Sequence, residues 1–248
     1  MRQEKINETL ISVVESWATT DNPFNSIDEI LAWVRKKIAA TKVSVRKRHY
    51  LYDGREWFYD QAKGEIRHKS GHFFQIKGLK LFADDTLIHE QPIIVQKEIG
   101  YLGIIARKID GILYFLMQAK IEPGNVNVIQ ISPTIQATKS NFMRVHGGQE
   151  PPYLSYFSRA DQYEILVDQI QSEHSSRFFG KRNRNIIIVV DDEIEVRDSH
   201  RWMTLGQIKK LMQYDNLVNM DTRTVISCIP FALRDYSGTE LRHLRHLF

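Results

Sequence analysis

The chain of 248 residues contains one cysteine, seven prolines and 13 glycines, and it lacks any long apolar run. The single cysteine, Cys228, excludes an internal disulfide and favours a reducing compartment such as the cytoplasm. The low proline and glycine content argues against extended disorder. No apolar stretch approaches the roughly 20 residues that span a bilayer, and residues 1–5 do not resemble a signal peptide. We therefore expect a soluble, cytoplasmic, globular protein that does not associate with a membrane.

The charge of the chain leaves the class of partner open. A formal net charge of +4 hints at an anionic partner. The basic residues form local groups at 46–48, 181–184 and 242–245. Such groups suit nucleic acid or a nucleotide diphosphate, or they simply contact solvent. Nucleic-acid binding would leave a neutral polar segment, described below, without a role, so we expect no nucleic-acid partner.

Helical patterns open the chain and strand patterns follow. Apolar residues at 6, 10, 13, 14 and 17 predict a first helix. A second begins at a capping box formed by Ser26 and Glu29. From about residue 43 to residue 131 the pattern becomes that of strands, with one strand predicted over 92–96 and a hairpin around Asp110-Gly111. We predict an N-terminal helical extension over 1–42 and a single domain over 43–248.

The last third of the chain mixes strands and helices. The apolar run 186–190 predicts a strand covered on both faces. Thr204 and Gln207 form a second capping box, and Asp221 is predicted to cap a short helix before Pro230. Helices before and after a mostly antiparallel sheet indicate the α+β class, with a mixed β-sheet layered with helices.

One segment is unusually polar for a chain that only has to fold. Residues 130–141 carry eight hydrogen-bonding side chains in twelve positions, and only one of the eight is charged. A dense, neutral set of donors and acceptors is what orients a sugar with several hydroxyls. The alternative is that these Ser, Thr and Asn side chains form turns and helix caps.

Arginine and asparagine alternate immediately before the apolar run at 186–190. In a strand, Arg182 and Arg184 would project on one side, with Asn183 and Asn185 on the other. Guanidinium groups suit bidentate contact with phosphate. The alternative is a basic, solvated strand entry, and the pattern alone favours neither.

Several segments, in this order, resemble the signature of NDP-hexose 2,3-dehydratases. They are residues 115–125, 130–141, 145–148, 171–173, 181–185, 205–208 and 215–225. So many polar matches in one order make a highly specific signal, and they are concentrated between about residues 114 and 230.

The resemblance implies a hydro-lyase that acts on dTDP-4-keto-6-deoxyglucose or a related nucleotide sugar and gives a 3,4-diketo-2,6-dideoxy product. It implies a Nudix-like fold, but a dehydration that needs neither a metal nor another cofactor. The sequence lacks the Arg-Glu-x-x-Glu-Glu-x-Gly helix of Nudix hydrolases, which disfavours a magnesium-dependent pyrophosphatase. The expected reaction starts with loss of the C3 proton beside the 4-ketone, followed by loss of the C2 hydroxyl.

The matching segments supply the candidate site residues. Glu173 or His146 is expected as base or acid, and Lys120, next to Glu122, as the group that polarises the ketone. The alternatives are an ion pair between Lys120 and Glu122 and a loop histidine held by backbone. Arg182 and Arg184 would bind the diphosphate, and Trp57 would stack on the base. The full set of substrate-binding candidates is Trp57, Gln118, Gln130, Ser132, Thr134, Gln136, Ser140, Asn141, Tyr153, Lys181, Arg182, Asn183 and Arg184; we expect no metal site.

Members of the family commonly hold two related modules in tandem, whereas this chain holds one. We therefore expect a homodimer that stands in for the tandem modules. The competing hypothesis is a catalytically silent module that binds the nucleotide sugar or serves as the partner subunit of a complete enzyme.

Overall fold

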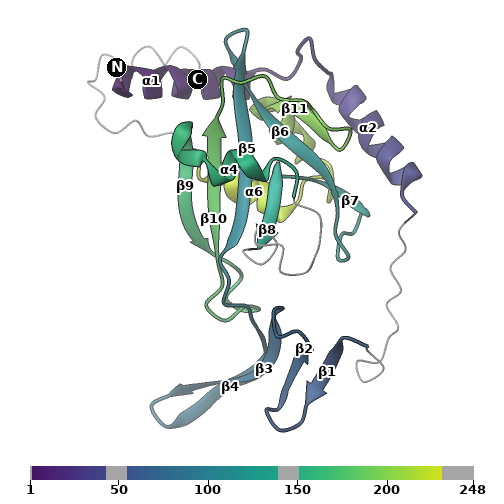
Figure 1. The fold of residues 1–248 in the computed structure, drawn as a ribbon, viewed down its shortest axis with the longest axis vertical. Coiled ribbons are helices and arrows are strands. Elements are labelled where there is room, and N and C mark those ends of the chain that lie inside the picture. Colours follow the sequence, from purple (N-terminus) through teal and green to yellow (C-terminus); the bar gives the residue numbers. More distant parts are fainter. Residues whose placement is uncertain (1, 43–54, 139–150, 231–248) are drawn as a thin grey trace.

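The computed structural model describes residues 2–42, 55–138 and 151–230 (Figure 1). Its helices are α1 (Arg2–Ala18), α2 (Ile27–Ala40), α4 (Leu154–Ser158), α5 (Leu205–Leu211) and α6 (Met220–Ser227), with a 3-10 turn η2 (Ala160–Gln162). Its strands are β1 (Trp57–Asp60), β2 (Glu65–His68), β3 (Gln75–Ala83), β4 (Thr86–Val95), β5 (Gly100–Ile109), β6 (Ile112–Ile121), β7 (Ile129–Ser132), β8 (Ile135–Thr138), β9 (Glu164–Ser172), β10 (Arg182–Val189) and β11 (His200–Thr204). None of the described helices combines the length and the apolar character needed to cross a membrane.

A seven-stranded mixed sheet forms the body of the fold. Its main path runs β11-β6-β5-β10-β9, with β7 beside β6 and β8 beside β5. β5 and β10 run parallel, whereas the other pairs in this sheet are antiparallel. Ile186, Ile187 and Ile188 at its centre are fully buried, which confirms the predicted strand covered on both faces. Helices α2, α5 and α6 contribute to the core on one face, and α4 contributes to the core on the other. The α+β class is therefore confirmed.

The predicted turn and cap signals lie where the sequence placed them. Asp110 and Gly111 join β5 to β6 with φ angles of 50° and 87°, the positive values that a tight hairpin requires. Ser26 accepts a bond from the Glu29 amide at 3.2 Å, and the Glu29 carboxylate accepts one from the Ser26 amide at 2.7 Å. The second capping box, at Thr204 and Gln207, also forms.

A separate four-stranded antiparallel sheet, in the order β1-β2-β3-β4, lies at the lower end of the molecule (Figure 1). β4 begins at Thr86, earlier than the strand predicted over 92–96, because the chain turns at Asp84 with a φ of 49° and pairs back on β3. Pro92 is tolerated because β4 is an edge strand. The Ile94 amide donates to the Arg177 carbonyl at 2.9 Å, and the Phe179 amide donates to the Ile94 carbonyl at 2.8 Å. These bonds attach the small sheet to the loop between β9 and β10.

The N-terminal helices pack into the same body as the large sheet. Val13 of α1 and Ile30, Trp33 and Val34 of α2 belong to the main hydrophobic cluster. The predicted boundary at residue 42 adjoins residues 43–54, which lie outside the described part of the chain, so the two-part division stays a prediction.

Gly206 fixes how closely α1 approaches α5, and its replacement by alanine is expected to destabilise the fold. A Cβ there would lie 2.5 Å from the Trp17 carbonyl oxygen and 2.6 Å from that of Thr19, and these backbone atoms cannot rotate away. We expect Gly206→Ala to lower the free energy of unfolding by about 1–3 kcal/mol, the usual cost of overpacking. Thermal unfolding measures it, with Gly78→Ala as control because nothing lies within 4 Å of a Cβ at Gly78. Equal Tm values for the two variants would contradict this account of the packing.

Candidate active site

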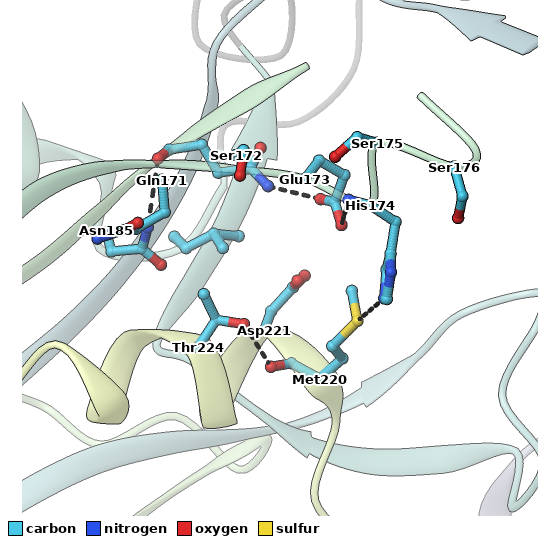
Figure 2. Close-up of a pocket in the computed structure, with 12 residues that line it drawn as sticks. Gln171, Ser172, Glu173, His174, Ser175, Ser176, Asn185, Met220, Asp221 and Thr224 are labelled. Atoms are coloured by element: carbon cyan, nitrogen blue, oxygen red, sulfur yellow. Dashed lines mark hydrogen bonds between the residues drawn. The ribbon is translucent and has the colours of Figure 1, made fainter. Parts of the chain in front are cut away.

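A cleft lies where β9 ends, β5 and β10 begin, and α6 starts (Figure 2). Its larger cavity, of about 630 Å³, is lined by Leu102, Gln171, Ser172, Glu173, His174, Ser175, Ser176, Asn183, Asn185, Met220, Asp221 and Thr224. A second cavity, of about 210 Å³, is lined by Gln96, Gly100, Leu102, Lys120, Gln136, Ala137, Thr138, Glu173, Phe178, Lys181, Asn183 and Asp221. The two cavities share Leu102, Glu173, Asn183 and Asp221, so they form one continuous cleft.

The two polar segments singled out in the sequence meet in this cleft. Gln136 and Thr138 come from the first, and Lys181 and Asn183 come from the second. They come together because β8 and β10 flank β5 on its two sides. The neutral hydrogen-bonding segment and the Arg-Asn segment therefore share one binding surface, although they lie far apart in the chain.

Two carboxylates point into the larger cavity from facing walls (Figure 2). Glu173 follows β9, and one of its oxygens accepts a 2.6 Å hydrogen bond from the Asn183 amide. Asp221 lies in the first turn of α6 and is half-buried. Burial raises the pKa of Asp221 to about 6, assisted by the charges of Glu173 and Glu122 and opposed by that of Lys120. A carboxyl of this kind exchanges protons near neutral pH, as a general base must.

Asp221 does not cap α6, contrary to the prediction. Asn219 is the N-cap residue, and its side-chain oxygen accepts a 2.8 Å bond from the Thr222 amide. The amide nitrogen of Asn219 also donates to the Ser132 hydroxyl at 2.9 Å and to the Gln136 side chain at 3.3 Å. Because Asn219 satisfies the helix end, the Asp221 carboxylate is left to face the cleft. The sequence did contain a signal for this arrangement. Asn219 and Asp221 are both of a type that caps helices, and only one of them can cap α6, so the other is free to serve the cleft.

Lys120 brings a positive charge to the same cleft. Its ammonium nitrogen lies 3.9 Å from the Glu122 carboxylate and donates to the Gln136 carbonyl at 3.3 Å. Burial lowers the pKa of Lys120, while the charges of Glu122 and Asp221 act to raise it. The Gln136 side chain completes the group by donating to Glu122 at 2.9 Å. The ion pair with Glu122 and a place in the cleft are thus both present, so these two interpretations of Lys120 do not exclude each other.

Lys181 and Asn183 make the wall on the β10 side. Lys181 is buried and its ammonium donates to the Glu98 carbonyl, and burial lowers its pKa. Asn183 packs over Gly100 so closely that a Cβ there would collide with the Asn183 side-chain oxygen. A glycine at residue 100 is therefore needed to seat Asn183 in the cleft.

Arg182 and Arg184 do not line either cavity of the cleft. Arg184 forms a bidentate ion pair with Asp168, both bonds being 2.7 Å long, and its guanidinium lies 5.4 Å from the Tyr101 ring centre. Arg182 is exposed. Alternate residues of a strand face opposite sides of a sheet, and on β10 the asparagines face the cleft.

Other candidates have structural partners outside the cleft. Trp57 packs against His68, Phe73 and Phe74 in the small sheet. The Tyr153 hydroxyl donates to the Glu195 carbonyl and accepts from the Arg197 amide.

The remaining polar candidates, on β6, on β7 and between β7 and β8, do not line the cleft. Thr134 is fully buried and bonds to the backbone of Ile105 and Leu116, and Gln130 donates to the Asn216 carbonyl. Ser132 holds Asn219, while Gln118 lies on β6 opposite Ser132. Three further candidates, Ser140, Asn141 and His146, lie outside the described residues. Among those described, no group of three or more His, Cys, Asp or Glu side chains is placed to hold a metal ion.

Comparisons with known proteins agree with the resemblance carried by these segments. A family model described as NDP-hexose 2,3-dehydratase matches residues 27–229. The chain is 40% identical, over 223 residues, to a dTDP-4-dehydro-6-deoxy-alpha-D-glucopyranose 2,3-dehydratase from Amycolatopsis orientalis, covering 87% of this chain and 47% of the relative. It is 48% identical, over 178 residues, to a protein of the same name from Saccharopolyspora spinosa, covering 71% of this chain and 37% of the relative.

The chain spans less than half the length of these curated relatives. Solved structures resemble it only distantly. An ADP compounds hydrolase, for example, aligns over 83% of this chain and 98% of its own length, with a TM-score of 0.39 and 10% identity.

Proposed function

Because the chain belongs to the NDP-hexose 2,3-dehydratase family, we propose that it removes water from a nucleotide-linked 4-keto-6-deoxyhexose, with dTDP-4-keto-6-deoxyglucose as the first substrate to test. The observation that carries the proposal is the cleft itself. It combines two carboxylates, Glu173 and Asp221, with the ammonium group of Lys120. Around them lie neutral amide and hydroxyl groups suited to a sugar.

The reaction balances without a cofactor. A base removes the C3 proton, and the electron pair of the C3–H bond moves onto the oxygen of the 4-ketone as an enolate. The enolate then re-forms the ketone while a C2–C3 double bond forms and the C2 hydroxyl leaves, protonated, as water. The resulting 3-enol loses its hydroxyl proton and gains a proton at C2, giving the 3,4-diketone. The substrate ketone acidifies C3 and accepts the charge, so the protein has only to move protons and stabilise an enolate.

In this scheme Asp221 is the base at C3. The proton that it takes is then the one delivered to the C2 hydroxyl, so one carboxyl serves both steps. Glu173, the sequence candidate for base or acid, faces Asp221 and increases its affinity for a proton by like-charge repulsion. Lys120 stabilises the enolate oxygen, and Glu122 keeps Lys120 charged and oriented.

The hydroxyls of the sugar need neutral partners, and the cleft supplies them. Gln136, Thr138, Gln171 and Asn183 line its walls. Asn183 is already fixed by Glu173, and Gln136 by Asn219, so their polar ends are held in place before a sugar arrives. Such preorganisation reduces the entropy lost on binding.

Incubating the protein with dTDP-4-keto-6-deoxyglucose in D₂O tests the proposal and its competitor. An active dehydratase yields the diketo sugar with deuterium from the solvent at C2, the carbon at which the 3-enol gains a proton. A catalytically silent module binds the sugar nucleotide without dehydration, which would refute the lyase assignment. Failure to bind would refute both. Trapping the product with a diamine identifies the adjacent ketones.

We propose that the partner is a second copy of the module. We also propose a cytoplasmic location, because the single cysteine favours a reducing compartment. The chain matches less than half the length of these curated relatives. In addition, exposed apolar side chains gather on the β3–β4 hairpin. Leu81, Phe82, Leu87 and Ile88 are between 44% and 56% exposed, more apolar surface than a solvated hairpin normally presents. A homodimer would cover it.

The molar mass in solution is expected to equal two chains. Replacing Leu81 and Ile88 together by aspartate would introduce two charges into the contact and shift the mass toward one chain. Light scattering after gel filtration measures it. Val126→Asp is the control, since Val126 is 73% exposed on the β6–β7 turn, away from the hairpin. A single-chain mass for the unaltered protein would contradict the dimer.

A further inference from the structure

The geometry points to a cavity on the small sheet as the binding site for the nucleoside diphosphate part of the substrate. The inference rests on the proposed nucleotide-sugar substrate and names where its anionic half is held. The cavity has a volume of about 440 Å³ and is built from β2, β3 and the segment that follows β4. It is distinct from the cleft that holds Asp221 and Glu173.

The lining of this cavity carries an excess of positive charge. Four basic side chains, Lys63, Arg67, Lys77 and Lys97, face two carboxylates, Glu65 and Glu98. Glu65 is buried and already engaged, because Lys77 lies 2.8 Å from it and Arg67 lies 3.4 Å from it. Arg67 also lies 3.5 Å from the Asp60 carboxylate, so Lys77 and Arg67 are balanced by Glu65 and Asp60 and form a fixed floor for the cavity.

Lys63 and Lys97 are the groups left to meet a ligand. Both are exposed, and among the described residues neither has a carboxylate within ion-pair distance. Two unpaired ammonium groups at the mouth of a cavity suit a diphosphate, whose oxygens accept charge-assisted hydrogen bonds.

An aromatic ring lies in the same lining. Phe73 is 42% exposed, and its ring centre lies 5.9 Å from that of Trp57. Bases stack on exposed aromatic rings of this kind. Trp57, the sequence candidate for stacking, thus supports the ring that borders the cavity.

The basic cavity adjoins the catalytic cleft. Gln96 lines both the basic cavity and the smaller cavity of the cleft. Lys181 lines the cleft and donates a hydrogen bond to the backbone carbonyl of Glu98, and Glu98 lines the basic cavity. The bonds between Ile94 and the β9–β10 loop hold the two parts together. The arrangement places an acid-base centre at one end and a cationic site at the other, matching a substrate with a neutral keto-sugar at one end and a diphosphate at the other.

We assign this role to the small sheet in preference to Arg182 and Arg184 of β10. Arg184 is already neutralised by two bonds to Asp168, and neither Arg182 nor Arg184 lines the cleft. The charge that the diphosphate needs is supplied instead by side chains of the small sheet and its neighbouring segment.

Calorimetric binding of dTDP to the full chain tests the inference. We expect the double variant Lys63→Gln, Lys97→Gln to raise the Kd for dTDP at least about tenfold, the loss that one charge-assisted bond represents. Its Kd should also depend less steeply on salt than that of the unaltered protein, a change that a general loss of structure would not produce. Lys80→Gln is the matched control, because Lys80 lies on β3 of the same sheet and outside the cavity lining.

Inorganic pyrophosphate, used as a competitor, separates the two halves of the ligand. The lysine variant should weaken both dTDP and pyrophosphate. Phe73→Ala should weaken dTDP about tenfold through lost stacking and leave pyrophosphate unchanged. If the lysine variant binds dTDP as tightly as the unaltered protein, the inference is overturned, while dehydration of the sugar nucleotide still supports the proposed function. If dTDP binds normally but no dehydration occurs, the proposed function fails and the binding site stands.

Discussion

Replacing Asp221 by asparagine is expected to lower kcat for dehydration about 10²- to 10⁴-fold, the usual contribution of a positioned general base. Asparagine keeps the size and polarity of the side chain but cannot accept the C3 proton. Since Asp221 lies in the sugar cleft and not in the basic cavity, the Kd for dTDP should stay within about twofold. Product formation and dTDP binding, measured on the same preparation, separate the two effects.

The pH profile gives a second readout of Asp221. Its pKa of about 6 means that the carboxylate form accumulates as pH rises through this value. The activity of the unaltered protein should therefore rise on the acid side around pH 6. In Asp221→Asn the residual activity should lose that limb, because the titrating group is gone.

Stability should change in the opposite direction to activity. The folded-state pKa of Asp221 lies above its ordinary value of 3.8, so the folded protein binds the extra proton between these two pH values. Stability therefore falls as pH rises through this window, and the full cost of a desolvated charge is present above pH 6. Asp221→Asn removes that charge and is expected to raise Tm at pH 7.5. An inactive variant with a raised Tm cannot be explained by misfolding.

Asp215→Asn is the matched control, since Asp215 is an exposed carboxylate just before α6 and outside the cleft lining. It should alter neither kcat nor the pH profile. An Asp221→Asn variant that keeps its activity would remove Asp221 from the mechanism and return Glu173 or His146 to the role of base.

Local signals in the sequence predicted local structure well. The two capping boxes and the Asp110-Gly111 hairpin each depend on residues within four positions of one another, and each forms as expected. The apolar run 186–190 also predicted its burial correctly, because a strand covered on both faces needs apolar residues at every position.

The site depended on contacts that no local pattern contains. Which side of β10 faces the cleft is decided by its parallel pairing with β5 and by the packing of α6, so the asparagines and not the arginines enter it. Asp221 was assigned to a helix end because the sequence alone does not reveal that Asn219 already occupies that position. Strand β8 was hidden within the polar segment, where only Ile135 and Ala137 face the core.

Lys120→Met is the second substitution with a large expected effect. Methionine retains the apolar stem and removes the ammonium group that is proposed to stabilise the enolate. We expect kcat to fall about 10²- to 10³-fold, as when one preorganised donor to a developing oxyanion is lost. Lys108→Met, on the exposed face of β5, is the control and should leave kcat unchanged.

The charge of Lys120 also lowers the pKa of Asp221, whereas the charge of Glu122 raises it. The acid limb of the activity profile should therefore move to higher pH in Lys120→Met, because the carboxylate loses its nearby cation. It should move to lower pH in Glu122→Gln, because a like charge is removed. Opposite displacements of the acid limb in these two variants require that the charges of Lys120 and Glu122 both act on the carboxyl that titrates, as expected if this carboxyl is Asp221. If both variants shifted the limb in the same direction, or neither did, the titrating group would not be Asp221 and Lys120 would not act beside it.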